Sequence, residues 1–269
     1  MLEAKNVNYA YTKGVPVITD IDCRIEDGEF VALLGQNGSG KTTLSRLFMA
    51  LCHPRSGKIL VDGEDIVNLE PADLADKIGY VFQNPDLQIL EDTVFDEVAY
   101  GPRAKKLTEE TVKEQVDAAL AAMGLTSLAG AYPRLLSFGQ KRRLGVAAAL
   151  ALNPRTLILD EITNGQDALE KEHMLQYLRD VNKQRGITVV LISHDMDAVY
   201  RYSDRAVVLH RGGIVFDGTP ATLFSGAEPL EKWGLRSPAV ASLAAALGIK
   251  AATAEEFCAA VTVKGGERP

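Results

Sequence analysis

The sequence predicts an α/β fold built on a mostly parallel β-sheet. Several short runs are apolar throughout, as in strands that helices cover on both faces. Amphipathic helical patterns separate these runs, which is the alternation expected of parallel strands joined by right-handed crossovers. The chain has 269 residues, of which 46% are hydrophobic, and this is enough to bury a substantial core.

The composition excludes several classes of protein. The formal net charge is −7 and 24% of the residues are charged, which is typical of a folded globular chain and not of a disordered or collagen-like one. The acidic balance argues against nucleic acid as a partner. The longest apolar runs, residues 144–152 and 239–249, are much shorter than the roughly 20 residues of a membrane span. Three widely spaced cysteines predict reduced thiols in a cytosolic protein.

The first strands and helix follow from periodicity. In residues 19–25, Thr19 and every second residue after it are predicted to face the core, which is the period of a half-buried strand. Residues 30–34 are apolar on both faces and predict a strand inside a parallel sheet. The next apolar residues have the spacing of a helix packed on a sheet, and we expect them to be buried: Leu44, Leu47, Phe48 and Leu51.

The remaining elements alternate in the same way. A helix is predicted to start after Thr108, which is a good N-cap, and to end near Gly124. Leu169, Leu175 and Leu178 belong to a further helical stretch that stops at Gly186. Four more buried strands are predicted at residues 79–82, 156–159, 187–192 and 206–209.

Three regions fall outside the alternation. Residues 1–28 together with 58–65 predict short antiparallel strands, and residues 84–150 predict helices without a strand. Residues 226–269 are rich in alanine and predict a small helical appendage. We therefore expect an added β layer, a helical insert and a C-terminal appendage around the main sheet.

The strongest motif lies after the first buried strand. Residues 35–42, GQNGSGKT, match G-x-x-x-x-G-K-[ST] and sit between a strand and an amphipathic helix, as this motif requires. Its glycines let backbone N–H groups wrap a polyphosphate, and the helix N-terminus adds partial positive charge. We predict that Lys41 contacts the β- and γ-phosphates and that Thr42 holds Mg²⁺. The setting disfavours a plain glycine-rich turn.

Two carboxylates follow another predicted strand. Asp160 and Glu161 end the apolar run of residues 156–159. Ligands of open α/β sheets bind at the carboxyl ends of strands, so both side chains are expected near the nucleotide. We predict that Asp160 binds the metal through its water shell and that Glu161 polarises the attacking water. Alone, such a pair is more often a solvated turn, and the phosphate-binding motif decides between the two interpretations.

Residues 136–140, LSFGQ, resemble the signature of the ABC-type ATPases, usually written LSGGQ. The order of phosphate loop, signature and LDE is that of an ABC nucleotide-binding domain. The resemblance covers roughly residues 2–225. It implies a P-loop NTPase fold with a RecA-like core, an antiparallel β subdomain and a helical subdomain at about residues 84–150. The domain would span residues 1–225, with the appendage of residues 226–269 as a dimerisation element.

The resemblance also implies roles for residues outside the main motifs. Tyr11 would stack on adenine, Gln83 would reach the metal and the attacking water, and His194 would reach the γ-phosphate; Asp167 matches the D-loop aspartate. The catalytic set is then Glu161, His194 and Gln83, and the metal set is Thr42, Gln83 and Asp160. The full ATP-binding set is Tyr11, Gly35, Asn37, Gly38, Ser39, Gly40, Lys41, Thr42, Thr43, Ser137, Gly139 and Gln140.

The resemblance implies that one chain holds only part of each site. Ser137 and Gly139 would contact ATP on the phosphate loop of a second ATPase subunit, so two chains would close around two nucleotides. Ser137 is placed to begin a helix, whose dipole favours the γ-phosphate charge. Three residues depart from the family pattern in loops that we expect to face the dimer: Phe138, Ile162 and Gln166.

A narrower resemblance concerns the partner. Residues 82–86, FQNPD, with Gln88, residues 101–102 and the late Gly234, Leu235 and Pro238, resemble the ATPases of energy-coupling factor importers, which take up vitamins or cobalt and nickel ions. This implies integral membrane transport and substrate-binding subunits as partners, a groove for a coupling helix, and a peripheral location on the cytoplasmic face of the cell membrane.

Other ABC-type ATPases are the alternative interpretations. A DNA-repair or chromosome-structure ATPase needs a long coiled coil between the phosphate loop and the signature, and the segment from Thr42 to Ser137 has no sustained heptads. A translation-factor type would carry two such nucleotide-binding domains in one chain, and this sequence has one phosphate loop and one signature. A non-hydrolysing nucleotide sensor conflicts with the presence of Glu161 and His194.

Overall fold

The computed structural model describes residues 1–249, 251 and 253–266. Its main sheet has six strands in the order β10-β9-β3-β8-β7-β6. Five strands are parallel, and β10 pairs antiparallel with β9 at one edge. The predicted parallel α/β fold is confirmed. The strands are β3 (Phe30–Leu34), β6 (Ile78–Val81), β7 (Thr156–Asp160), β8 (Thr188–Ile192), β9 (Arg205–His210) and β10 (Gly213–Gly218).

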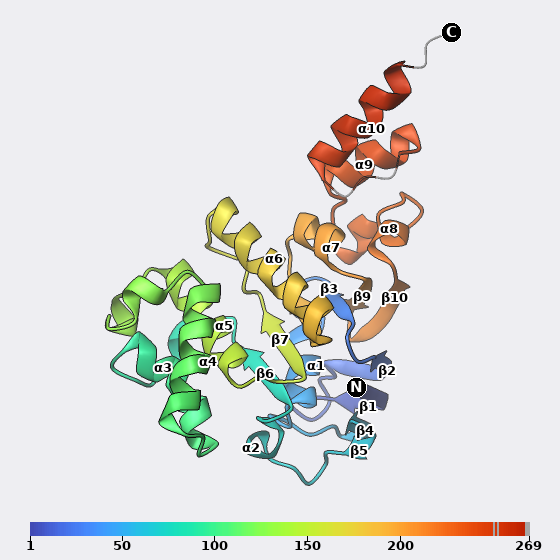
Figure 1. Cartoon of the computed structure of the whole chain (residues 1–269). Helices are drawn as coiled ribbons and strands as arrows, with labels where there is room; N and C mark the ends of the chain where they lie inside the picture. Colours follow the sequence, from blue (N-terminus) through green and yellow to red (C-terminus); the bar gives the residue numbers. More distant parts are fainter. Residues whose placement is uncertain (250, 252, 267–269) are drawn as a thin grey trace.

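A second, antiparallel sheet lies beside the first (Figure 1). Its order is β2-β1-β4-β5, and its strands are β1 (Leu2–Tyr9), β2 (Ile18–Ile25), β4 (Ser56–Val61) and β5 (Glu64–Asp65). The predicted alternation holds from Ile21 onward, but Thr19 is exposed and Ile18 is buried instead. The pairing of β1 with β2 is irregular here, and Asp20 has a φ of 49°, so the alternation shifts by one residue.

Both faces of the main sheet are covered. All five residues of β3 are buried, as the sequence predicts. Val31 and Leu33 belong to a core shared with helix α1 (Lys41–Phe48) and the antiparallel sheet. Phe30 belongs to a core that includes α6 (Ala168–Arg185) and the helical region. The phosphate-loop strand is therefore held rigidly from both sides.

Helix α1 is shorter than its predicted stripe. Leu44, Leu47 and Phe48 are buried, but Leu51 lies beyond the helix and is 42% exposed. The reason is local, because Ala50 has a φ of 52°, which turns the chain before Leu51 can continue the stripe. A short helix, α2 (Pro71–Leu74), follows the antiparallel sheet.

Residues 84–150, all of which the structure describes, contain helices and no strand. Thr93 and Thr108 each cap the helix that follows by accepting a backbone N–H. Helices α3, α4 and α5 pack against one another at one side of the main sheet (Figure 1). The elements are α3 (Val94–Ala104), α4 (Glu109–Ala122) and α5 (Phe138–Ala151), with single 3₁₀ turns η1 (Pro85–Leu87), η2 (Thr126–Leu128) and η3 (Pro133–Leu135).

The C-terminal part starts from α6, which ends at Gly186 with a φ of 68°, as predicted. Leu169, Leu175 and Leu178 all lie in this helix, as predicted; Leu175 and Leu178 are buried, whereas Leu169 is exposed in the first turn. Three of the last helices, α7 (Met196–Tyr202), α8 (Pro220–Leu223) and η4 (Leu230–Trp233), share a core with β3 and β9. The final helices, α9 (Ala239–Leu247) and α10 (Ala254–Gly266), project away from the sheets (Figure 1). No helix in the described part of the chain is long and apolar enough to cross a membrane.

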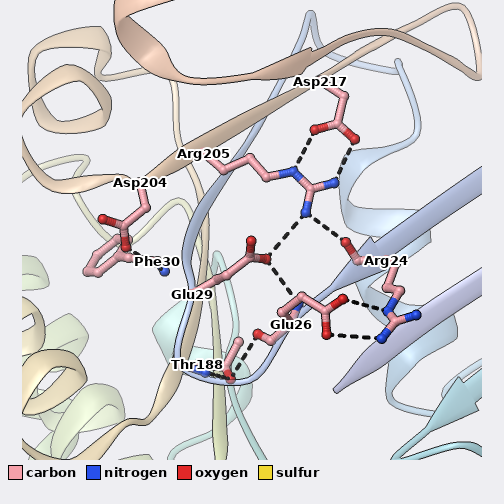
Figure 2. A network of polar contacts seen from close by, with 9 residues as sticks. Arg24, Glu26, Glu29, Phe30, Thr188, Asp204, Arg205 and Asp217 are labelled. Carbon is pink, nitrogen blue, oxygen red and sulfur yellow. Dashed lines mark hydrogen bonds and ion pairs between the residues drawn. The ribbon is translucent and has the colours of Figure 1, made fainter.

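A polar network joins the two sheets (Figure 2). Arg205 of β9 donates two hydrogen bonds to Asp217 of β10, at 2.5 and 2.6 Å, and a third to the carbonyl oxygen of Arg24 at 2.8 Å. Its guanidinium also contacts Glu29 at 3.3 Å. Burial raises the pKa of the neighbouring Cys23 thiol to about 12, so that this thiol stays protonated.

Candidate nucleotide-binding and catalytic site

The loop between β3 and α1 has a backbone that only glycine permits at several positions. Gly35, Gly38 and Gly40 have φ values of 136°, 80° and 109°. A Cβ atom built on Gly35 would lie 2.1 Å from the carbonyl oxygen of Leu209, so no larger residue fits there. The loop therefore keeps a compact shape that leads directly into the N-terminus of α1.

Lys41 lies inside this loop. Its Nζ donates hydrogen bonds to the carbonyl oxygens of Gly35 at 2.7 Å and Gln36 at 3.0 Å, and the residue is buried. Burial lowers the pKa of the ammonium, and the negative charges of Glu161 and Asp160 act against this. The cation is thus held between the loop and the two carboxylates.

Asp160 ends β7 with a carboxylate that is only partly hydrogen-bonded. The hydroxyl of Tyr80 donates to its Oδ2 at 3.2 Å, while its Oδ1 is buried and has no hydrogen-bond partner among the described residues. Burial raises the pKa of Asp160, and the nearby hydroxyls of Thr42 and Tyr80 act against this rise. The arrangement fits Mg²⁺, which takes hard oxygen ligands and needs few from the protein when a polyphosphate supplies the others.

Glu161 collects three polar side chains from three different segments. Gln83 donates to its Oε2 at 2.6 Å, Asn164 donates to the same oxygen at 3.1 Å, and His194 Nε2 lies 3.1 Å from its Oε1. The backbone of Glu161 has a φ of 51°, and its N–H donates to the carbonyl oxygen of Ile192. This conformation turns the carboxylate away from the direction of the strand.

Tyr11 lies apart from the carboxylates but reaches α1. Its hydroxyl is 3.3 Å from Thr43 Oγ1, and Arg46 donates to it at 3.4 Å. The ring packs edge-on against Tyr9, and the residue is 52% exposed. Its exposed ring therefore lies near the phosphate loop, and its role in binding adenine stays a prediction.

The signature residues lie at the start of α5, where they contact one another and the loop after β7. Ser137 is the N-cap of α5 and forms a capping box with Gln140, at 2.9 and 3.2 Å. Gly139 faces Gly165 and Gln166, which follow Glu161. Within the described chain, no hydrogen bond joins residues 137–140 to the phosphate loop. The structure thus brings Lys41, Thr42, Gln83, Asp160, Glu161 and His194 together and leaves the signature outside that group.

Two contacts of this group are absent from the sequence prediction. Asn164 bonds the Glu161 carboxylate directly, and Tyr80 bonds Asp160. The contact of Tyr80 with Asp160 could have been predicted from strand register, because β6 is the parallel neighbour of β7. Tyr80 pairs with Ile158, two residues before Asp160. No pattern marks Asn164, since its contact depends on how the loop after β7 turns back.

Comparisons with known proteins identify the family of this chain. Residues 18–164 match the family described as ABC transporter. The chain is 40% identical over 250 residues to the energy-coupling factor transporter ATP-binding protein EcfA2 of Caldanaerobacter subterraneus subsp. tengcongensis, covering 90% of this chain and 87% of that protein. It covers only 45% of a longer ABC transporter ATP-binding relative, TTE1589, of the same organism.

Solved structures are also similar. The cbiO1 protein of Clostridium perfringens, described as part of the ABC transporter complex cbiONQ, has a TM-score of 0.77 and 36% identity, over 90% of this chain and 97% of that one. A dimeric post-hydrolysis structure of the ATP-binding cassette MJ0796, bound to ADP and Pi, has a TM-score of 0.76 and 29% identity, over 82% and 99%. The predicted nucleotide-binding fold, with its antiparallel and helical parts, is confirmed.

Proposed function

The chain belongs to the ABC transporter family of ATPases, and from this premise we propose that it is the ATP-hydrolysing subunit of an energy-coupling factor importer of a vitamin or a transition-metal ion. One observation supports hydrolysis above all. Gln83, Asn164 and His194 converge on Glu161, beside a lysine held in a phosphate loop.

In this proposal some residues bind the phosphates and the metal, and others activate the attacking water. Lys41 and the N-terminus of α1 bind the phosphates, and Thr42 and Asp160 hold the metal. Mg²⁺ would neutralise charge on the phosphates. Glu161 accepts the proton of the attacking water. Gln83 and Asn164 fix one oxygen of its carboxylate, and His194 meets the other, so the base is oriented before ATP arrives.

A second ATPase subunit would complete the site. Ser137 is exposed at the start of α5 and Gly139 follows it as a buried residue, and both lie outside the group around Lys41. A helix N-terminus stabilises an anion, so a partner's α5 can cover the γ-phosphate of this chain's ATP. A second copy or a related subunit meets this need. The dimeric MJ0796 structure supports pairing of this kind.

A groove next to the site supports a membrane partner. A cavity of about 320 Å³ is lined by residues that follow α1, by β6 and by α3 and α5. Leu51, Leu90 and Tyr100 line it and are exposed, although they are apolar or aromatic. Exposed apolar side chains around a hollow are typical of a docking surface. A short helix of an integral membrane subunit fits this groove and would place the chain at the cytoplasmic face of the membrane.

Purification from membranes tests this partner. We expect integral membrane subunits to accompany the tagged chain in detergent. Leu90→Asp and Tyr100→Glu place charge in the groove, so they should release those subunits while leaving ATP binding within about twofold of the parent. Glu114→Gln on the exposed face of α4 is the control. Membrane subunits that stay bound to both groove variants would contradict the docking surface.

Glu161→Gln tests the catalytic part. The amide keeps the shape of the carboxylate but cannot accept the proton, so turnover should fall by about 10²-fold or more while ATP binding persists. Under ATP the variant should accumulate as a closed pair, visible by size-exclusion chromatography with light scattering. Hydrolysis at the parental rate would show that Glu161 is not the base.

A further inference from the structure

We propose that Arg142 is a positioning residue that couples the signature segment of each chain to that same chain's Gln83 and Glu161. This inference rests on the proposed pairing of two ATPase subunits. Its effect would be that nucleotide bound against one chain's signature adjusts the catalytic base of the other site, through contacts inside a single chain.

The first link is Phe138, which stands where the family has a glycine. It is the first residue of α5, next to Ser137, and is 45% exposed. The guanidinium carbon of Arg142 lies 4.6 Å from the centre of its ring. The ring also lies close to Gly165, where an added Cβ atom would lie 2.8 Å from Phe138 Cδ1. Phe138 therefore joins the exposed start of the signature helix to a buried cation.

The second link is Arg142 itself, which is only 3% exposed. It donates from one terminal nitrogen to the carbonyl oxygen of Gln83 at 3.2 Å. Its Nε and its other terminal nitrogen have no hydrogen-bond partner among the described residues. Burial lowers the pKa of this guanidinium, and the negative charges of Glu161 and Asp160 act against that. The Phe138 ring, the Gln83 carbonyl oxygen and the negative charges of Glu161 and Asp160 thus stabilise the buried cation.

The third link is Gln83, whose side chain donates to Glu161 at 2.6 Å. The carbonyl that Arg142 holds and the amide that orients Glu161 belong to the same residue. A shift of Phe138 on closure against a partner's ATP would move Arg142 and thereby Gln83. The unused donors of Arg142 allow it to follow the carbonyl to a new position.

The two basic neighbours of Arg142 have different tasks. Lys141 pairs with Asp86 at 2.7 Å, and Arg143 pairs with Glu170 at 2.7 Å. Both pairs anchor the first turns of α5 to adjacent segments. Of these three consecutive basic residues, Arg142 is the one that stacks on Phe138 and bonds Gln83. Arg142 is therefore placed to pass a movement of Phe138 on to Gln83, and not only to hold the helix in place.

Four single variants of the full chain, and the double variant that combines Phe138→Leu with Arg142→Lys, test the coupling. Phe138→Leu removes the ring, Phe138→Tyr keeps it, and Arg142→Lys keeps the charge but loses the planar fork. Arg201→Lys is the matched control, because Arg201 lies 5.2 Å from the ring centre of Tyr202 in α7, away from the site. The measurements are ATPase rate against ATP concentration, the Hill coefficient, and Mg-ATP affinity.

We expect Phe138→Leu and Arg142→Lys each to lower kcat about tenfold and to reduce the Hill coefficient towards one, with ATP affinity within about twofold of the parent. The double variant should lose no more than either single variant, because both break the same path. Phe138→Tyr and Arg201→Lys should keep the parental kcat and Hill coefficient.

Two results would overturn the coupling while leaving the ATPase assignment intact: losses that multiply in the double variant, or an unchanged kcat and Hill coefficient in Phe138→Leu. Phe138 is half exposed, so its replacement leaves folding intact even if Arg142→Lys does not. A parental chain that hydrolyses no ATP, alone or with its membrane subunits, would overturn the proposed function and this inference together.

Discussion

Lys41 combines a buried charge with two backbone carbonyl partners. Its Nζ donates hydrogen bonds to the carbonyl oxygens of Gly35 and Gln36 within its own loop, so the ammonium lies inside the phosphate loop. Such a group is costly to bury unless a negative ligand approaches, and the carboxylates of Asp160 and Glu161 supply part of that compensation. The γ-phosphate would supply the remainder.

The residue-scale prediction is that Lys41→Ala abolishes tight ATP binding. The substitution removes the ammonium that faces the phosphates, and we expect affinity to fall by about 10²-fold or more in isothermal titration. Lys183→Ala removes an exposed lysine of α6 that lies near Asp204, and it should bind ATP as the parent does. An affinity for ATP that Lys41→Ala does not change would contradict the loop assignment.

The three departures from the family pattern lie in different surroundings. Ile162 is fully buried among core residues, so its side chain faces the interior of this chain. Gln166 donates to the carbonyl oxygen of Ile162 at 2.9 Å and so closes the loop after Glu161. Only Phe138 of the three has a half-exposed side chain at the start of the signature helix.

At the scale of elements, helix caps combine stability with function. Ser137 and Thr108 both accept a backbone N–H at the start of a helix. Only Ser137 lies in the signature. The two caps therefore form a pair in which structural and functional effects can be separated.

Ser137→Ala and Thr108→Ala should each lower the free energy of unfolding by about 1 kcal/mol, because each leaves a helix N–H without its cap. Only Ser137→Ala should also reduce ATP turnover, since its hydroxyl would face a partner's nucleotide. Urea unfolding and steady-state ATPase assays measure the two effects. Equal turnover in both variants would show that the Ser137 hydroxyl does not contribute to ATP turnover.

A second prediction at this scale concerns the clamp between α6 and β3. Asp204 accepts two hydrogen bonds from Arg179, at 2.7 and 2.6 Å, and one from the N–H of Phe30. These contacts lower the pKa of Asp204 in the folded state. The unfolded chain then binds the proton more readily, so the contribution is complete above the ordinary aspartate pKa of about 4 and is lost as pH falls through the lower folded value.

Asp204→Asn should therefore cost about 1 kcal/mol at pH 7, a figure that allows for solvent screening of this partly exposed pair. The cost should shrink as pH falls below 4. Urea unfolding of parent and variant at several pH values gives the difference. A difference in stability that does not depend on pH would mean that the carboxylate charge contributes nothing.

At the scale of the whole molecule, the C-terminal segment has two parts. Trp233 and Leu235 are buried in a core with β3 and β9, so this stretch belongs to the packing of the main sheet. Helices α9 and α10 extend beyond it (Figure 1), and Leu243 of α9 is half exposed. A cut that tests pairing must therefore fall after Leu235.

A chain ending at Pro238 should keep ATP affinity within about twofold but dimerise at least about tenfold more weakly, because it lacks α9 and α10 and their exposed apolar residues. Analytical ultracentrifugation with ATP measures the pairing, in the Glu161→Gln background where closed pairs persist. Equal dimerisation of the cut and full chains would reject a pairing role for these helices.

Local patterns were sufficient for most strands and for the phosphate loop. Residues 30–34 could only be a doubly covered strand, and residues 35–42 form a motif whose chemistry is fixed by its own spacing. The strand β10 was missed, because four of its six residues are half-buried, the other two are exposed, and its edge position leaves little hydrophobic pattern. Leu51 and Thr19 were misplaced because a single turn or bulge overrides periodicity.

Spacing along the chain identified the residues that could bind phosphate, because that property depends on a contiguous loop and the helix after it. How Glu161 is held follows from the folded chain and not from any local pattern, since Gln83, Asn164 and His194 lie in three loops whose positions depend on strand order and loop turns. The same holds for Phe138, Arg142 and Gln83, which are brought together by packing of α5 against the loop after β6. Short-range spacing fixes local geometry, whereas contacts between distant segments exist only once the core has packed.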